Sequence, residues 1–179
     1  MSEATLTSPP VSRVEPVDEE FHGEQVPDPY RWLEDGGSDE VRAWVAAQNA
    51  YTEETLSRAP GCEEIKRRLT ELLQTDTVGV PVVRNGRYFF QRRQGTQNQP
   101  VLYVREDVAG TDRALVDPNA LSEGGTVALD WFFPSRDGRL LAYGLSENGS
   151  ELSTLRVLDV ESGRQLSGQI DRTLSLIHI

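Results

Sequence analysis

The spacing of hydrophobic residues changes near residue 77, from a helical pattern to a strand pattern. From Ser38 to about Arg58, apolar and aromatic residues recur every three or four positions, as on one face of an amphipathic helix. Ser38 is a favourable N-cap, and the acidic residues that follow it suit the positive end of the helix dipole. After Pro60-Gly61 the same spacing returns over residues 62–74. The first half of the chain therefore predicts two amphipathic helices.

A short aromatic segment precedes these helices. Tyr30, Trp32 and Leu33 supply a large apolar surface. We expect their segment to form a helical turn that packs against another part of the protein. Pro29 forces the preceding residues into an extended conformation. Residues 1–14 are rich in Ser, Thr and Pro, and we expect a disordered leader there. Because two helices bury little surface by themselves, residues 15–76 are expected to pack on another domain or on each other.

After residue 77 the pattern is that of short strands joined by tight turns. The stretch 126–166 contains strand candidates at 127–133 and 140–146, a third around 155–160, and a short fourth that follows Gly163. Asp-Gly and Asn-Gly dipeptides between them supply the positive φ that tight hairpins need. An earlier set of four strand candidates covers residues 80–83, 87–93, 101–107 and 114–117.

The two sets of strands form a sequence repeat. Arg84-Asn85-Gly86-Arg87 matches Arg136-Asp137-Gly138-Arg139 at an offset of 52, and residues 102–106 match residues 155–159 at an offset of 53. A period near fifty, with four strands per unit, is typical of β-propeller blades. We therefore expect an α+β chain: a helical segment over residues 15–76, followed by two four-stranded antiparallel blades over residues 77–172.

Two blades cannot close a propeller ring, which needs roughly four to eight. The open blade faces and strand edges would favour aggregation. We expect the chain to be the front part of a longer protein. The alternative from another functional class is a stand-alone binding module that assembles a ring from several copies.

Charge and cysteine content narrow the classes of partner. The net charge is −11, and residues 1–76 hold 17 acidic and 7 basic residues against 12 and 11 in residues 77–179. This acidic half argues against nucleic acid or an anionic membrane as partner. The single cysteine, Cys62, excludes an intramolecular disulfide and a Cys/His metal cluster. With neither a secretory signal nor a stretch long enough to span a bilayer, a soluble cytoplasmic protein is expected.

A search for catalytic motifs predicts no catalytic, cofactor-binding or metal-binding residue. The chain has no Gly-x-Ser-x-Gly elbow, no phosphate-binding glycine loop and no His-Glu-x-x-His. Its two histidines, His22 and His178, lack a nucleophile to activate, so a structural role is favoured. Structural roles are also favoured for three other groups. Trp32 and Trp44 are interpreted as core residues, and Asp18-Glu19-Glu20 as a solvated surface. Arg92-Arg93 are interpreted as exposed strand residues, with a ligand contact as the alternative.

Several segments resemble the N-terminal part of prolyl oligopeptidases. Residues 28–35, DPYRWLED, resemble the family's "DPY-x-WLE", and residues 97–104 its "QNQ-x-VLYV". Residues 117–129 are similar to "DPN-x-LS…GTVAL", and residues 141–150 to "AYGLS-x-x-GS". These matches keep their order and spacing over about residues 18–172. The related oligopeptidase B group, whose members cut after basic residues, shares the aromatic segment and remains an alternative, but the last two motifs fit prolyl oligopeptidase better.

The resemblance implies a serine endopeptidase that cleaves short peptides after proline. In that family an α/β-hydrolase domain provides a Ser-Asp-His triad, and a seven-bladed propeller restricts access to it. The family pattern places the triad beyond residue 179, so the 179-residue chain is expected to be inactive alone. Its implied partners are short proline-containing peptides and the hydrolase domain in cis, with no cofactor, nucleic acid or membrane. Residues 173–179 depart from the family pattern, and we expect a non-native tail there.

Overall fold

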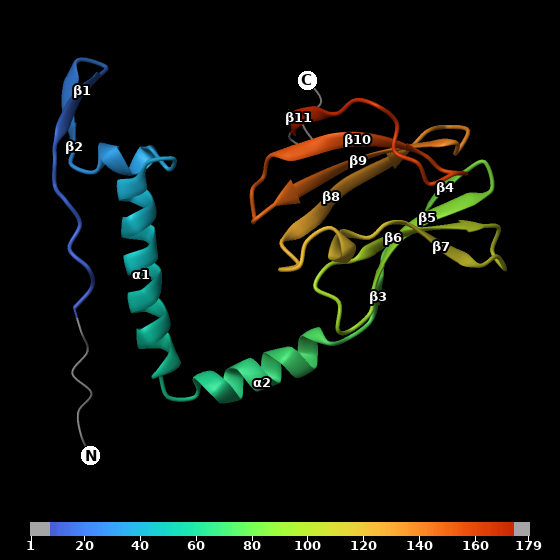
Figure 1. Ribbon diagram of the computed structural model, residues 1–179, viewed down its shortest axis with the longest axis horizontal. Helices are drawn as coiled ribbons and strands as arrows, with labels where there is room; N and C mark the ends of the chain where they lie inside the picture. The colour runs from blue at the N-terminus through green and yellow to red at the C-terminus, as the bar shows by residue number, and fades with distance from the viewer. Residues whose placement is uncertain (1–7, 174–179) are drawn as a thin grey trace. The chain divides into compact units, whose positions relative to one another are not determined.

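The computed structural model describes residues 8–173. The chain divides into two compact units, with the boundary between Leu69 and Thr70. The first unit contains a hairpin, a short 3-10 helix and a long helix, and the second contains two antiparallel sheets (Figure 1).

The first unit begins with a hairpin that the hydrophobic pattern did not predict. Strands β1 (Val17–Phe21) and β2 (Glu24–Asp28) pair antiparallel, and His22 and Gly23 make the turn with φ of 54° and 85°. Half of the ten strand residues are acidic and most are exposed, and Glu19 interrupts the alternation between Val17 and Phe21, so no continuous apolar face indicates the strands. The predicted helical turn is confirmed as the 3-10 helix η1 (Arg31–Glu34).

Both predicted helices are present. Helix α1 (Asp39–Ser57) begins at Ser38, whose Oγ accepts a hydrogen bond from the Val41 backbone N–H at 3.2 Å. Helix α2 (Cys62–Leu73) has no buried residue, and its apolar positions are half or more exposed, at 51–62%: Ile65, Leu69, Leu72 and Leu73. The apolar face that the sequence pattern predicts for α2 is thus formed by residues that are at least half exposed.

The two tryptophans of the first unit pack on each other. The rings of Trp32 and Trp44 meet edge to face, with centroids 6.3 Å apart and planes at 87°. Their indole N–H groups donate to the Arg13 carbonyl and to the Ser12 hydroxyl at 3.0 and 2.9 Å. Of the leader expected over residues 1–14, residues 1–7 lie outside the described part, and residues 12 and 13 hydrogen-bond to this pair.

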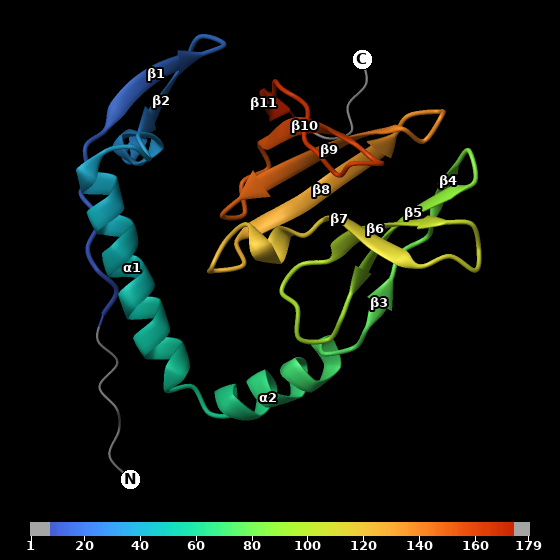
Figure 2. The same ribbon diagram turned by 45° about the vertical axis from the view of Figure 1, so that its right-hand side comes forward.

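The second unit contains two antiparallel sheets (Figures 1 and 2). The first has the order β3-β5-β6-β7, with β4 also paired to β5, and the second has the order β11-β10-β9-β8. A short 3-10 helix, η2, lies between them in sequence. The bounds are β3 (Thr77–Val78), β4 (Val82–Arg84), β5 (Arg87–Arg93), β6 (Val101–Glu106), β7 (Asp112–Val116), η2 (Pro118–Ala120), β8 (Val127–Pro134), β9 (Leu140–Glu147), β10 (Ser153–Asp159) and β11 (Ile170–Thr173).

Strand positions agree with the sequence pattern except at the two ends of the repeat. Of the strand expected over residues 80–83, only residues 82 and 83 are in a strand, β4, because Pro81 has no N–H for a ladder; β3 is a separate short strand before it. The strand expected directly after Gly163 was placed too early. Only Gln165 forms an isolated bridge there, to Leu158, and β11 starts at Ile170.

The core lies between the two sheets. Phe89 and Leu102 of the first sheet and Leu141 and Leu158 of the second are at most 2% exposed and belong to one cluster. The repeated turns also meet: the Asn85 side-chain amide donates to the Asp137 carbonyl at 3.3 Å. The two repeats thus stack with equivalent turns in contact.

Candidate functional site

A pocket opens at the edge of the second sheet. It is lined by residues of strands β8, β9 and β10, of the β9–β10 turn and of the loop after η2: Leu121, Val127, Leu145, Glu147, Ser150, Leu152, Thr154 and Arg156. Its volume is about 460 Å³. We call it the rim pocket.

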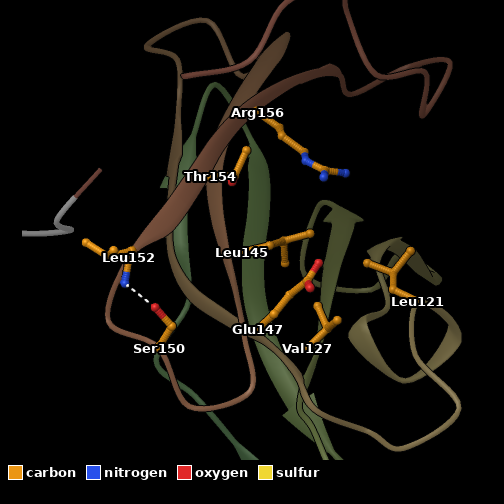
Figure 3. A pocket seen from close by; sticks show the side chains of 8 residues that line it. All are labelled: Leu121, Val127, Leu145, Glu147, Ser150, Leu152, Thr154 and Arg156. Carbon is orange, nitrogen blue, oxygen red and sulfur yellow. Dashed lines mark hydrogen bonds between the residues drawn. The ribbon is translucent and has the colours of Figure 1, made fainter. Parts of the chain in front are cut away.

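The rim pocket is lined mainly by polar groups, among them one acid and one base. Figure 3 shows Leu145, Glu147 and Arg156 extending toward the same open side, with Leu121 across from Leu145 and Val127 beside Glu147. Within residues 8–173, Glu147 and Arg156 have no ion-pair partner. The Arg156 Nε atom is buried without a hydrogen-bond acceptor.

The loops around this pocket form one rim of the second unit. Gln99 and Asn119 exchange two hydrogen bonds of 2.9 Å, which join the β5–β6 loop to η2. The Asn148 backbone N–H donates to the Thr126 carbonyl at 3.0 Å, which joins the β9–β10 turn to the start of β8. The family-like motifs around residues 97–104 and 117–129 therefore meet on this rim, where they position the walls of the pocket.

The chain reaches the first sheet at the same rim. Arg93 donates to the Leu73 carbonyl at 2.5 Å, and the Gly95 backbone N–H donates to the Asp76 carboxylate at 2.8 Å. A Cβ on Gly95 would lie 2.1 Å from the Gln74 carbonyl oxygen, so only glycine fits against this segment. Arg93 is thus a structural residue that holds the segment before β3.

Arg92 is also engaged within its sheet. Its guanidinium lies 4.3 Å from the Tyr103 ring centroid and 2.6 Å from the Asp112 carboxylate. Arg105 contacts the same carboxylate at 2.6 Å. Hydrogen bonds from Arg105 first and then Arg92 hold the pKa of Asp112 below its ordinary value. Arg92 and Arg105 therefore form a network within the first sheet through Asp112.

The acidic run at residues 18–20 is not simply a solvated surface. Glu19 receives two hydrogen bonds of 2.6 Å from the Arg31 guanidinium, and Asp28 receives one of 2.8 Å. These bonds lower the pKa of both carboxylates. The interpretation of Glu19 as a solvated surface residue is wrong, because Arg31 binds its carboxylate. The sequence pattern does not reveal this pair, since Arg31 lies twelve residues away, on η1.

The remaining sequence candidates lie apart from the rim pocket. His22 is in the β1–β2 turn, Cys62 is half-buried at the start of α2, and His178 lies outside the described residues. No three His, Cys, Asp or Glu side chains among residues 8–173 come together as a metal site. In the same range no helix is both long and apolar enough to cross a bilayer.

Comparison with known proteins identifies the family. Residues 9–175 match the family model described as prolyl oligopeptidase, N-terminal β-propeller domain. The chain belongs to this family. The resemblance found in the sequence motifs is confirmed, and the two sheets belong to a β-propeller domain.

Curated relatives are full-length peptidases. The chain is 35% identical over 161 residues to prolyl endopeptidase of Elizabethkingia meningoseptica. This alignment covers 90% of this chain and 23% of the relative. It is 35% identical over 170 residues to the prolyl endopeptidase of Elizabethkingia miricola, with 95% and 23% covered. The chain thus spans about a quarter of the length of these relatives.

Solved structures superpose on this chain and share its fold. A structure from a study of two prolyl endopeptidases superposes with a TM-score of 0.81 at 41% identity, over 92% of this chain and 24% of that one. Oligopeptidase B from Leishmania major superposes with a TM-score of 0.70 at 15% identity over 92% of this chain and 26% of that one, which shows a shared fold.

Sequence reasoning missed the rim pocket. One local feature could have indicated it: Arg156 is a cation inside the apolar run Leu155-Arg156-Val157-Leu158. A charge on the inward face of a predicted strand needs a partner or a function. The side chain that shares its pocket, Glu147, lies on another strand, and no local pattern links the two.

Proposed function

We propose that this chain is the N-terminal part of a serine endopeptidase of the prolyl oligopeptidase type, a hydrolase that cleaves short peptides after proline. The observation that supports this most directly is the 41% identity, with a TM-score of 0.81, to a prolyl endopeptidase structure over 92% of the chain. Its single cysteine fits a reducing compartment, and the cytoplasm is the location we propose.

In the parent enzyme the chemistry belongs to the hydrolase domain. A serine attacks the carbonyl that follows proline, a histidine accepts the serine proton, and backbone N–H groups stabilise the oxyanion. The present chain supplies no member of this triad. It contributes the first two blades of a seven-bladed propeller that restricts access to short peptides.

The first unit has a different role in this proposal. Residues 15–76 would pack on the hydrolase domain before the chain reaches the propeller. The exposed apolar positions of α2 support this role, since residues such as Leu69 and Leu73 are 51% and 62% exposed.

The test compares the 179-residue chain with the full-length parent on two reporter peptides, one cleavable after proline and one after arginine. We expect the parent to cleave the proline reporter and the chain alone to cleave neither. Preference of the parent for the arginine reporter would indicate an oligopeptidase B-type enzyme. Turnover by the chain alone, if abolished by a serine-directed inhibitor, would show that the triad is present after all.

A second candidate is a self-assembling propeller module without catalysis. The observation that favours it is the open face of the second sheet, where Phe133 is 48% exposed beside Trp131. Such a module would form a monodisperse oligomer with one cooperative melting transition. Light scattering on the purified chain separates this outcome from a loose monomer or polydisperse aggregates, which the proposed enzyme fragment predicts.

A further inference from the structure

We propose that this chain binds a second copy of itself head to tail: the outer face of the second sheet packs on the outer face of the first sheet of the next copy. The proposal deepens the second candidate function, on which it rests, because it names the two surfaces that join the copies. An enzyme fragment would expose the same two faces. The support comes from the way in which the two sheets already pack inside one chain.

The first sheet packs on the second through one of its two faces. Phe89 pairs with Val82 on one neighbouring strand and with Val104 on the other. All three side chains contribute to the core between the sheets. Because successive residues of a strand point to opposite faces, Tyr88 and Phe90 lie on the outer face of the first sheet.

The outer face of the second sheet is the counterpart of that inner face. Val157 is the counterpart of Val104 at the repeat offset of 53. It pairs with Ala142, which in turn pairs with Phe133. In the first sheet the equivalent positions are covered by a neighbouring sheet, whereas Phe133 is 48% exposed. The second sheet therefore presents an open copy of a surface that is buried in the first.

The two equivalent faces also carry similar bulk. In the first sheet the ring belongs to Phe89, and its cross-strand neighbour is the smaller Val82. In the second sheet the ring belongs to Phe133, and its cross-strand neighbour is the smaller Ala142. The aromatic ring has thus moved to the adjacent strand, and a face that keeps its total volume usually keeps its packing. We expect both faces to fit the same kind of partner surface.

The outer face of the first sheet is the counterpart of that partner surface. Tyr88 pairs with Arg105 on this face. Their counterparts at the offset of 53, Leu141 and Leu158, pair in the same way and are buried in the core. A pocket of about 260 Å³ opens here, lined by Val78, Pro81, Tyr88, Phe90, Arg105 and Val108. We infer that the Phe133 ring of a second copy enters this pocket.

Charge supports the same pairing of faces. The outer face of the first sheet holds the guanidinium groups of Arg92 and Arg105 and the single carboxylate of Asp112 between them. On the outer face of the second sheet, the Asp130 carboxylate accepts a hydrogen bond from the Ser146 hydroxyl at 2.9 Å. Opposite charges on two faces favour their association. Since each copy offers one face of each kind, the contact is heterologous and can repeat from copy to copy.

The experiment uses two variants of the 179-residue chain that each block one face. Phe133→Lys places a charge on the outer face of the second sheet, and Val78→Glu places one at the pocket of the first. We expect each variant alone to associate about tenfold or more weakly than the unaltered chain in sedimentation velocity, because a charge buried in an apolar contact is costly. An equal mixture of the two variants should form dimers, since each keeps the face that the other has lost.

Controls separate this contact from general stickiness and from misfolding. Phe21→Lys is the matched control, because Phe21 is similarly exposed, at 52%, and lies on the β1–β2 hairpin. It should associate like the unaltered chain. A second pair, Phe133→Ser with Val108→Glu, tests the same two faces through different changes and should also form dimers on mixing. Thermal melting checks that each variant is folded.

An unaltered chain that stays monomeric at every concentration would overturn the proposal. Two folded variants whose mixtures form no dimers would do the same, as would a loss of association in Phe21→Lys. These outcomes leave the peptidase assignment untouched, because proteolysis is measured with the full-length parent. Dimers in the mixture, together with a parent that does not cleave the proline reporter, would support the contact and reject the proposed enzyme.

Discussion

Gly144 lies directly beneath the indole of Trp131. A Cβ built on Gly144 would stand 2.3 Å from Trp131 Cε2 and 2.4 Å from its Nε1. These two residues pair across strands β8 and β9, next to the bulge between Leu129 and Trp131. The absence of a side chain at position 144 therefore lets the indole lie flat against the sheet.

We expect Gly144→Ala to destabilise the protein by about 1–3 kcal/mol, since overpacking of a fitted site has costs of this size. Urea unfolding followed by fluorescence measures the change. Gly36→Ala is the matched control, because a Cβ at Gly36 meets no atom within 4 Å, and it should change stability little. Equal stability of Gly144→Ala and the unaltered chain would show that the indole moves freely.

Asp112 is the shared acceptor of Arg92 and Arg105, and its side chain is 15% exposed. We expect Asp112→Asn to cost about 1 kcal/mol at pH 7, because two charge-assisted contacts weaken. The folded-state pKa of Asp112 is lowered, so its contribution is complete above the ordinary pKa and is lost as pH falls through the folded value.

The stability difference between Asp112→Asn and the unaltered chain should therefore shrink between pH 7 and pH 3. Urea titrations across that range measure it. Asp39→Asn serves as the control, since the Asp39 side chain is fully exposed. A difference that stays constant with pH would mean that Asp112 acts through packing and not through its charge.

At the level of elements, the start of helix α1 depends on one hydroxyl. Ser38 Oγ accepts from the Val41 N–H, one of the donors that a helix cannot satisfy internally. We expect Ser38→Ala to cost about 1 kcal/mol of helix stability and to speed hydrogen exchange at the Val41 amide. Ser38→Thr keeps the acceptor and should retain most of the protection. Unchanged exchange at Val41 in Ser38→Ala would mean that docking, not capping, holds this end.

Across the whole second unit, the two faces of the second sheet have different surroundings. One face packs on the first sheet through residues such as Leu141, while the other leaves Phe133 48% exposed. An open apolar sheet face of this kind is a site of association. In the proposed parent enzyme it would be covered by the next blade.

We expect Phe133→Ser to reduce self-association of the purified chain with little loss of stability, as measured by analytical ultracentrifugation and thermal melting. Phe89→Ser is the contrasting variant. Phe89 is fully buried between the sheets, and its truncation should cost about 3–5 kcal/mol and unfold the second unit. If Phe133→Ser associates as strongly as the unaltered chain, the contact surface lies elsewhere.

Local chemistry was enough to predict the helices, most strands and the family. The Ser38 side chain caps a backbone N–H three residues along, and Asn85-Gly86 turn through their own backbone, so both roles are visible in a few consecutive residues. The apolar periodicity of α1 and of β8 likewise depends only on neighbouring positions. The family-like motifs were recognisable because order and spacing survive in the linear sequence.

The tertiary structure alone decided which distant residues meet. The β1–β2 hairpin has no continuous apolar face, and the partner of Glu19 is an arginine on η1, twelve residues away. The rim pocket unites Leu121 with Arg156 through a loop and three strands. Periodicity and turn chemistry describe each residue's neighbours along the chain, whereas ion pairs and cavities depend on side chains that only the packed sheets bring together.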